Sequence, residues 1–436
     1  MSNIVNGEKI EWNENFKRAY DLMENSSESL FVSGRAGTGK STLVDHFRIN
    51  TKKQCVVLAP TGVAALNVKG QTIHSFFGFK PGITPSNIKQ STDQKKNLLY
   101  KQLEIIIVDE ISMARADLID CMDVFLRMHA RQPFEPFGGV QVVFIGDLYQ
   151  LPPVVVKSEE DFFYEKYDSP FFFDAKVFKN FQLKHLELDF VYRQKEAEFI
   201  EMLDAIRCGN VDDDVIEKIN KRVDGDLSKF LDQNYIYLST TNFMTEKINQ
   251  ERLSLIGSEA KQIIGSVSGD FPKDRLPTQE KLILKKGAQV MLLINDSQAK
   301  WVNGDIGIIK SIKEDLFEPE VVLNVPNKGE KTIKPFKWEI IKYVFNKKKN
   351  IIEAKVSGHF NQLPLKLAWA VTIHKAQGKT FDRVVVDFAS GTFASGQAYV
   401  ALSRCRTLDG LILRKPINKQ SAFVDERIVD FFNKIK

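Results

Sequence analysis

Residues 34–41 read Gly-Arg-Ala-Gly-Thr-Gly-Lys-Ser, a spacing typical of a loop that holds phosphates. The glycines let backbone N–H groups approach an anion without a Cβ atom in the way, and the start of the following helix adds partial positive charge. Lys40 can reach the outer phosphates, and Ser41 can supply a hydroxyl ligand for Mg²⁺. The sequence therefore predicts a site for ATP with Mg²⁺. Its candidate residues are Gly34, Gly37, Thr38, Gly39, Lys40 and Ser41.

Two carboxylates follow the apolar run at 105–108, in the order Asp109 and Glu110. The carboxyl end of a strand in a parallel sheet opens onto the crevice where nucleotides bind. Asp109 is placed to hold Mg²⁺, directly or through water, and Glu110 to polarise the water that attacks the γ-phosphate. Taken alone, an Asp-Glu pair after a strand is a weak signal. The phosphate loop upstream makes the catalytic interpretation the favoured one.

Three further side chains are candidates for the hydrolysis step. Gln150 follows the apolar run at 143–145 and could sense the γ-phosphate or the attacking water, although a plain surface turn would also explain it. Arg193 and Arg404 could neutralise charge on the transferred phosphoryl group, an effect worth about 10³–10⁵ in rate. The alternative for each arginine is an ordinary surface salt bridge.

Short apolar runs alternate with helix-compatible stretches in two parts of the chain, a pattern typical of parallel sheets covered on both faces. Between the two parts, residues 285–360 contain short β-type runs and an Asn303–Gly304 hairpin signal, which predicts an inserted β-barrel. The runs expected to be strands are Leu30–Ser33, Gln54–Ala59, Glu104–Val108, Gln141–Ile145, Tyr235–Ser239, Leu365–Ile373, Val384–Phe388 and Leu411–Leu413. The expected helices include Ser41–Arg48, Ala114–Met128, Ala197–Arg207 and Ser395–Arg404.

The composition is that of a soluble globular protein, with 43% hydrophobic and 27% charged residues in 436. No apolar run of about 18 residues is present, and the N-terminus lacks a signal-peptide pattern. We therefore expect a protein of the cytoplasm, if prokaryotic or viral, and of the nucleus or mitochondrion, if eukaryotic. The four cysteines are far apart and form no C-x-x-C pair, so we expect neither a zinc site nor disulfides.

Positive charge is concentrated in one stretch. Residues 331–379 carry eleven lysines against Glu339 and Glu353, a net charge of +9, whereas the whole chain has +5. Such an asymmetry favours a partner that carries phosphates. A solvated lysine face is the alternative.

The ordered motifs resemble those of superfamily 1 helicases and, within them, the petite-integration-frequency (Pif) family, which is related to the RecD helicases. The similarity extends over about residues 13–415 and includes a family-like connecting segment between residues 101 and 153. The motifs that carry it are Gly34–Ser41, Ala59–Ala65, Thr72–Phe76, Asp109–Glu110, Gly146–Pro153, Tyr192–Gln194, Thr372–Gly378 and Tyr399–Arg404.

The resemblance implies an ATP-dependent helicase that moves 5′ to 3′ on single-stranded DNA and unwinds duplex, forked or G-quadruplex DNA in replication, recombination or repair. It also implies binding at single-strand/double-strand junctions, displacement of bound proteins and action as a monomer. The implied fold is α/β, with two tandem RecA-like domains and a small SH3-like barrel inserted in the second. We expect domain 1A at 1–185 with a wedge-like excursion at about 78–96 that is too polar to contribute to a core, domain 2A at 186–284 and 361–436, and barrel domain 2B at 285–360.

Residue by residue, the resemblance implies a role in binding or hydrolysing ATP for Lys40, Ser41, Asp109, Glu110, Gln150, Arg193 and Arg404. Tyr192 could stack on adenine, with a core tyrosine as the alternative. Lys17 stands where many relatives carry a glutamine that reads adenine. The side chains implied to lie near DNA are Thr61, His74, Thr372, His374 and Lys375.

Three aromatic residues near these motifs, Phe76, Phe77 and Trp369, could stack on bases, but we favour core packing for them. Two other functions remain open at this stage. One is an RNA helicase, or a translocase that displaces proteins without unwinding; comparing DNA and RNA stimulation of ATPase would separate these. The other is a regulatory nucleotide-binding module without turnover, against which the intact catalytic carboxylates and arginines argue.

Overall fold

A computed structural model of the chain describes residues 4–5, 8–9, 12–192, 196–226, 234–296, 298, 300–315, 318–388, 391–392 and 394–435. The chain forms two compact units. Unit 1 consists of Met1–Tyr192, Glu339–Gly358 and Asp425–Lys436, and unit 2 of Arg193–Trp338 and His359–Val424. Arg193 itself lies outside the described residues.

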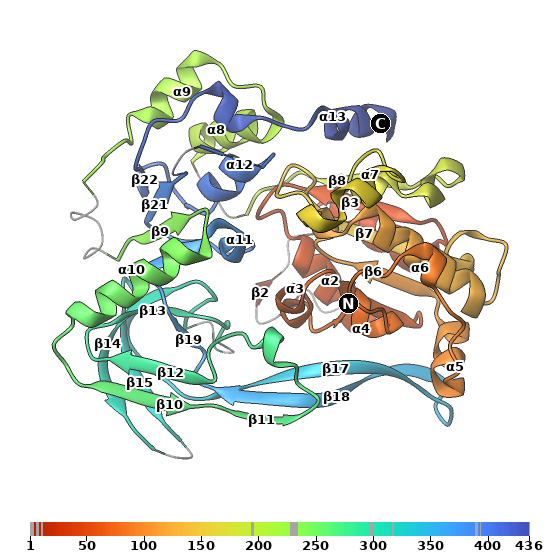
Figure 1. Cartoon of the computed structure of the whole chain (residues 1–436), viewed down its shortest axis with the longest axis horizontal. Helices are drawn as coiled ribbons and strands as arrows, with labels where there is room; N and C mark the ends of the chain where they lie inside the picture. Colours follow the sequence, from red (N-terminus) through yellow and green to blue (C-terminus); the bar gives the residue numbers. More distant parts are fainter. Residues whose placement is uncertain are drawn as a thin grey trace. The chain divides into compact units, whose positions relative to one another are not determined.

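Unit 1 is built on a six-stranded sheet in the order β5-β4-β6-β7-β3-β8, in which every neighbouring pair is parallel (Figure 1). A parallel sheet needs cover on both faces, and its four inner strands, β3, β4, β6 and β7, are accordingly mostly apolar and buried. The strands are β3 (Leu30–Gly34), β4 (Cys55–Ala59), β5 (Gln71–Thr72), β6 (Ile105–Val108), β7 (Gln141–Gly146) and β8 (Lys184–Leu188).

Alternate residues of the four inner strands enter separate cores on the two faces. In β6, Ile105 and Ile107 join the core formed with α1 and α2, whereas Ile106 and Val108 join the core formed with α6. The helices of unit 1 are α1 (Glu14–Asn25), α2 (Lys40–Asn50), α3 (Gly62–Asn67), α4 (Ile73–Phe77), α5 (Gln94–Gln102), α6 (Ala116–His129), α7 (Glu160–Tyr164) and α13 (Glu426–Ile435). The runs expected as strands in this part of the chain are therefore strands.

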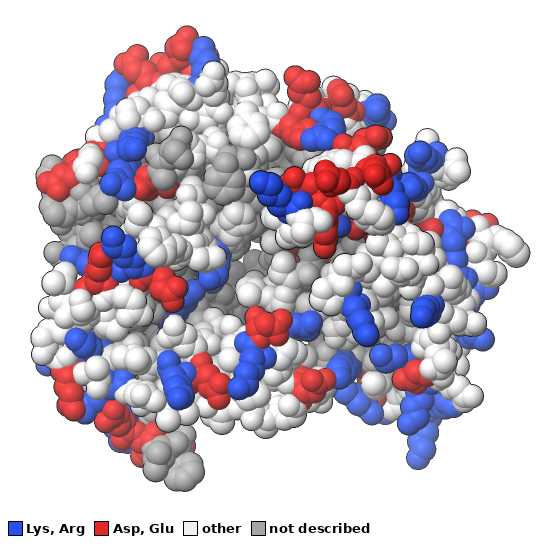
Figure 2. Space-filling view, in the orientation of Figure 1, with Lys and Arg blue, Asp and Glu red and all other residues white. Residues whose placement is uncertain are grey.

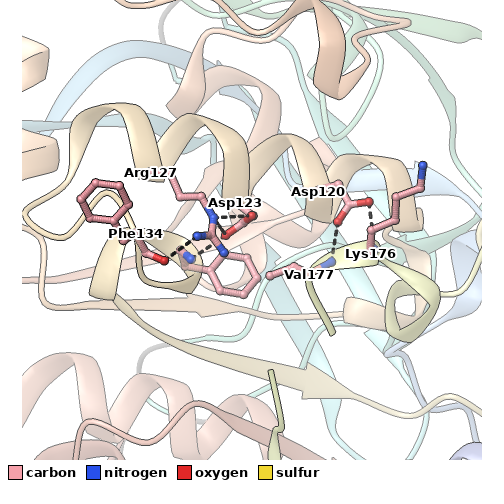
Figure 3. Close-up of polar contacts among 7 residues, drawn as sticks. Asp120, Asp123, Arg127, Phe134, Lys176 and Val177 are labelled. Carbon is pink, nitrogen blue, oxygen red and sulfur yellow. Dashed lines mark hydrogen bonds and ion pairs between the residues drawn. The ribbon is translucent and has the colours of Figure 1, made fainter. Parts of the chain in front are cut away.

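Helix α6 carries carboxylates that fasten neighbouring loops (Figure 3). Both carboxylate oxygens of Asp123 share the hydrogen bond that Arg127 Nε donates, Oδ1 also accepts from the backbone N–H of Phe137, and Arg127 Nη1 donates to the carbonyl of Phe134. Asp120 accepts from the backbone N–H groups of Lys176 and Val177. Because a buried carboxylate is stable only when hydrogen-bonded, Asp123 fixes the loop that leads into β7, and Asp120 fixes the segment that leads into β8.

Unit 2 contains a four-stranded parallel sheet in the order β20-β9-β21-β22. Its strands are β9 (Ile236–Ser239), β20 (Ala370–Thr372), β21 (Val384–Asp387) and β22 (Leu411–Leu413). Its helices are α8 (Ala197–Cys208), α9 (Asp213–Asn220), α10 (Asn242–Leu255), α11 (Ile373–Ala376) and α12 (Gln397–Leu402). Together with unit 1, this confirms an α/β fold with parallel sheets at its core.

The inserted region forms antiparallel sheets. Its main sheet has five strands in the order β16-β15-β14-β13-β19, and its edge strands, β16 and β19, do not pair with each other among the described residues. Its strands are β13 (Gln289–Leu292), β14 (Ile306–Lys313), β15 (Glu320–Val325), β16 (Gly329–Ile333) and β19 (Leu365–Leu367). Beside it, β10 (Ala260–Ile264) pairs with β12 (Lys281–Lys285), and β11 (Ser266–Gly269) adjoins the long strands β18 (Ile351–Gln362) and β17 (Phe336–Asn346).

The expectation of one strand at Leu365–Ile373 is wrong. The chain leaves the antiparallel sheet after β19, where Ala368 donates to the carbonyl of Gln289, and joins the parallel sheet at β20. Thr372 then caps α11 by accepting a hydrogen bond from the N–H of Lys375. A continuous apolar run does not reveal such a change of partner, because both sheets bury it.

The structure also groups two segments differently from the expected domains. Residues 339–358, the distal end of β17 and β18, belong to unit 1, and so does 425–436, which we had expected in domain 2A. The reason is apolar contact: Tyr343 and Ile352 of the hairpin and Phe432 of α13 join the core around Phe31. None of the described helices is long and apolar enough to cross a membrane.

Candidate functional site

The phosphate loop of unit 1 connects β3 to α2, as its sequence predicted. Gly37 and Gly39 have φ of 85° and 86°, a backbone conformation that favours glycine. At Gly34 the limit is space, since a Cβ atom would lie 2.5 Å from Thr38 Oγ1 and 2.7 Å from the carbonyl oxygen of Leu188. The loop therefore requires glycine at these three positions, and its curled backbone suits a phosphate.

Lys40 is held inside this loop. Its Nζ donates to the carbonyl oxygens of Gly34 at 2.7 Å and Arg35 at 2.8 Å. The ammonium is thus already positioned at the loop, where an anion would be its stronger partner. Ser41 is exposed at the start of α2, as a side chain must be to reach a metal ion.

Asp109 and Glu110 lie directly after β6 at the carboxyl edge of the sheet. Asp109 is 5% exposed, and burial, followed by the adjacent Glu110, raises the pKa of its carboxyl group. Lys40 opposes this shift by lowering the same pKa. Glu110 has φ 53° and ψ 44°, a left-handed conformation that is uncommon outside glycine. Oxygen ligands of this kind suit Mg²⁺, so these residues fit the expected metal.

Gln150 stands at the end of the neighbouring strand, β7, in the turn that contains Asp147. Its Nε2 donates to Asp147 Oδ2 at 3.2 Å, and its backbone N–H donates to the carbonyl of Asp147 at 3.0 Å. Both side chains are almost fully buried. Because β7 lies between β3 and β6, the turn, the phosphate loop and Asp109 occupy one edge of one sheet.

Tyr192 lies beside the phosphate loop. Its backbone N–H donates to the carbonyl of Gly37 at 2.9 Å, and its ring stands next to Gly39, where an added Cβ would be 3.6 Å from Tyr192 Cε2. The side chain is 41% exposed, so it is not a core tyrosine. This placement favours the adenine-stacking interpretation.

Arg404 is buried in unit 2 with 1% of its surface exposed. Its guanidinium donates to the carbonyl oxygens of Val400 at 2.8 Å and Lys379 at 3.1 Å, and to Ser403 Oγ at 2.8 Å. The side chain therefore fastens α12 to the end of the motif that begins at Thr372. Its predicted role in hydrolysis stays a prediction, as does that of Arg193.

The candidate DNA-facing residues follow the carboxyl ends of parallel strands within each unit. In unit 1, Thr61 follows β4 and caps α3 by accepting from the N–H of Ala64, and His74 lies in α4 after β5. In unit 2, Thr372 ends β20, and His374 and Lys375 are exposed on α11. Phe76, Phe77 and Trp369 are buried, which confirms core packing for all three.

Two lysines near Lys375 were not singled out from the sequence. Burial, with Lys375 as the second cause, lowers the pKa of Lys366 to about 8, and burial, with Lys366 second, lowers that of Lys379 to about 8. Lys379 Nζ also donates to Asn303 Oδ1 at 2.6 Å. Ammonium groups crowded together and withdrawn from water are well placed to receive a phosphate. The signal available in the sequence was the lysine excess at 331–379.

Comparison with known proteins agrees with this arrangement. The PIF1-like helicase family model matches residues 11–217. The ATP-dependent DNA helicase Pif1 of Bdellovibrio bacteriovorus is 32% identical over 438 residues, which are 98% of this chain and 93% of that protein. The chain belongs to the PIF1-like helicase family. The family and the enzyme class expected from the sequence are thereby confirmed: the chain is an ATP-dependent DNA helicase.

Solved PIF1 structures extend the similarity to the fold. A Bacteroides Pif1 in complex with ADP-AlF4 is 36% identical, with a TM-score of 0.90 over 97% of this chain and 96% of that one. A Bacteroides Pif1 bound to single-stranded DNA is 37% identical, with a TM-score of 0.68 over 97% of this chain and 96% of that one. Vertebrate PIF1 relatives are longer, and the chain spans about three fifths of their length.

Proposed function

We propose that the chain uses ATP and Mg²⁺ to move 5′ to 3′ on single-stranded DNA and to unwind the duplex that it meets. The observation that carries the proposal is the edge of the unit 1 sheet, where the phosphate loop, Asp109, Glu110 and Gln150 come together. Lys40 and Ser41 would hold the phosphates and the metal ion, which supplies charge neutralisation at the γ-phosphate. Glu110 would accept the proton of the attacking water.

The second part of the proposal concerns DNA. Helix N-caps and exposed side chains at the carboxyl ends of β4, β5 and β20 would bind the strand, with Lys366, Lys375 and Lys379 contacting phosphates in unit 2. The antiparallel sheet β16-β15-β14-β13-β19 would serve as the SH3-like barrel expected in the insert. Action as a monomer, unfolding of G-quadruplexes, and a place in the cytoplasm, nucleus or mitochondrion belong to the same proposal.

The deciding experiment measures ATP hydrolysis with and without single-stranded DNA, and unwinding of duplexes that carry either a 5′ or a 3′ tail. We expect DNA to stimulate hydrolysis and only the 5′-tailed duplex to be unwound. Lys40→Ala provides the control, because it removes the positive charge at the phosphates, and should lose both activities. Greater stimulation by RNA than by DNA would contradict the choice of substrate, and unwinding of the 3′-tailed duplex would contradict the polarity.

A further inference from the structure

The turn that joins β17 to β18 is tied to the body of unit 1. Gln54 Nε2 donates to the carbonyl of Asn350 at 3.3 Å, and Gln54 Oε1 accepts from the backbone N–H of Ile352 at 2.6 Å. The backbone N–H of Gln54 in turn donates to Glu104 Oε2 at 2.7 Å. The turn therefore lies beside the start of β4 and the residues that follow α5.

A second pair of contacts holds this hairpin in place. Tyr343 Oη accepts from the backbone N–H of Val57 at 3.0 Å, and the Tyr343 N–H donates to Gln71 Oε1 at 3.3 Å. The Tyr343 ring packs against Phe76, with ring centroids 6.1 Å apart. Burial raises the pKa of this phenol, so it stays protonated and the contact persists across the physiological pH range. These contacts fix the hairpin formed by β17 and β18, and therefore its turn, against unit 1.

Arginine and lysine side chains gather where the end of this hairpin lies beside α5. Arg131 Nε donates to the carbonyl of Lys101 at 2.6 Å and Arg131 Nη2 to Gln102 Oε1 at 2.9 Å, which brings the loop after α6 to the same place. Figure 2 shows lysine and arginine side chains at the lower right, where Figure 1 labels α5 and draws the end of the hairpin formed by β17 and β18. We call this the basic surface; it consists of Lys95, Lys96, Lys101, Arg131, Lys347, Lys348 and Lys349.

The basic surface carries seven cations, all exposed, and its segments also carry four carboxylates, Asp93, Glu104, Glu135 and Glu353. Glu353 pairs with Lys349 at 2.9 Å, Asp93 caps α5, and Glu104 holds Gln54. Within the part of the chain that the structure describes, no ion pair involves Lys95, Lys96, Lys347 or Lys348. These exposed ammonium groups, on α5 and on the turn between β17 and β18, attract a polyanion without requiring a particular arrangement of its charges.

The chemistry of the surface fits a duplex better than a single strand. Sites for single strands combine positive charge with aromatic rings on which bases stack. Here the aromatic rings that adjoin the surface are turned inward, since Phe76 is 4% and Tyr100 2% exposed. Phe134, in the loop after Arg131, is the exception at 92% exposed. A basic surface that offers no aromatic rings for base stacking suits double-stranded DNA, in which the bases are already paired and stacked.

We propose that the basic surface binds the phosphates of double-stranded DNA at the junction where the helicase works. This inference rests on the proposed function, because it assumes that the chain meets a duplex. The first residues of α5, including Lys95 and Lys96, form the end of the excursion at about 78–96, for which we expect a wedge role, so the surface would hold the duplex next to the point of strand separation. Each phosphate that it neutralises would add to the salt dependence of binding.

The test compares two ligands and two paired-lysine variants of the full chain. K347Q/K348Q removes charge from the turn, and K95Q/K96Q removes it from α5. Affinity is measured over a range of salt for a single-stranded oligonucleotide and for the same strand extended into a duplex. We expect each variant to bind the tailed duplex at least fivefold more weakly, to lower the slope of log affinity against log salt by about 1–2, and to bind the single strand within twofold of the unaltered chain.

K218Q/K221Q on α9 is the matched control, since it removes the same charge from lysines that already pair with Asp214, Glu198 and Glu217, and it should leave both affinities unchanged. F134A should also leave both unchanged. Equal loss of single-strand and duplex affinity in the lysine variants, loss of single-strand affinity in F134A, or no loss of duplex affinity would each overturn the inference. Hydrolysis stimulated by single-stranded DNA in the same preparations tests the proposed function separately.

Discussion

Phe432 stacks on Tyr149, with ring centroids 5.3 Å apart and the two planes within 1° of parallel. Phe432 belongs to α13 at the C-terminal end of the chain, and Tyr149 to the turn after β7. The Tyr149 N–H donates to Asp147 Oδ1 at 3.3 Å, and the next residue, Gln150, donates to the same carboxylate. The last helix of the chain therefore supports the turn that carries a candidate sensor of the γ-phosphate.

Phe432→Ala should lower the rate of hydrolysis while leaving the affinity for ATP nearly unchanged. The substitution removes the ring that supports Tyr149, so Gln150 loses its fixed position, and the lost burial weakens the docking of α13 by about 3–5 kcal/mol. Steady-state kcat and KM, with thermal unfolding on the same sample, measure both effects. Val429→Ala, at a position 39% exposed on the same helix, is the control and should change neither. A rise in KM alone would show that the turn serves binding instead.

Glu110→Gln should bind ATP normally and fail to hydrolyse it. The amide has the shape of the carboxylate and keeps the left-handed backbone at this position, but it cannot accept a proton from water. We expect a long-lived complex with ATP on single-stranded DNA. Equilibrium nucleotide binding and single-turnover hydrolysis, measured separately, check this. Parallel loss of binding and chemistry would contradict the role.

Arg404 requires a test that separates chemistry from folding. Arg404→Ala would leave the carbonyls of Val400 and Lys379 without their buried donor, at a cost of about 1–3 kcal/mol for each such group. Arg404→Lys keeps the charge but not the forked geometry. If Arg404 acts on the phosphoryl group, the lysine variant should melt close to the unaltered chain yet hydrolyse ATP about 10³-fold more slowly. Recovery of both stability and hydrolysis by lysine would show that the arginine is structural.

The lowered pKa values of Lys366 and Lys379 predict that the affinity for DNA depends on pH. Both have a pKa near 8 in the free protein, and a bound phosphate favours the charged form, so affinity should fall as pH rises through 8. The loss should approach about tenfold per lysine between pH 7 and 9, with proton uptake on binding at pH 8. Titration calorimetry in buffers of different ionisation enthalpy measures that uptake. K366Q/K379Q should abolish this proton uptake. If the uptake is unchanged in that variant, these lysines do not contact the DNA.

The sequence predicts which strand ends carry the candidate nucleotide site, because its residues are local in the chain. A phosphate loop between a strand and a helix, and carboxylates directly after an apolar strand, carry their geometry in their spacing. Contacts between distant segments leave no such mark. The residues at 425–436 do not reveal that Phe432 would stack on Tyr149. Similarly, the short β-type runs expected at 285–360 do not reveal the long strands β17 and β18, or that Tyr343 would bind Val57.

The excursion at about 78–96 departs from its expected character in one respect. We expected it to be too polar to contribute to a core, yet Ile88 is 9% exposed, and Phe79 and Ile83 pack against the unit 1 core. The backbone N–H of Ser91 also donates to His129 Nε2 at 2.8 Å. These contacts hold one side of the segment to the body of unit 1 and leave residues 80–82 and 86–87 exposed. A wedge needs such a rigid base.

Replacing Lys80, Pro81 and Asn87 with Gly or Ser, the residue types already present at Gly82 and Ser86, should therefore impair strand separation without disturbing the fold. The three apolar anchors remain, so the free energy of unfolding should change by less than about 1 kcal/mol. Hydrolysis stimulated by single-stranded DNA should be nearly intact, because the strand and the ATP site are untouched. Duplex unwinding should fall at least tenfold, which is about 1.4 kcal/mol in barrier height. Unwinding and hydrolysis measured on one preparation decide the matter: if unwinding is unchanged, the obstacle that parts the strands lies elsewhere, with the hairpin signal at Asn303 the next place to test.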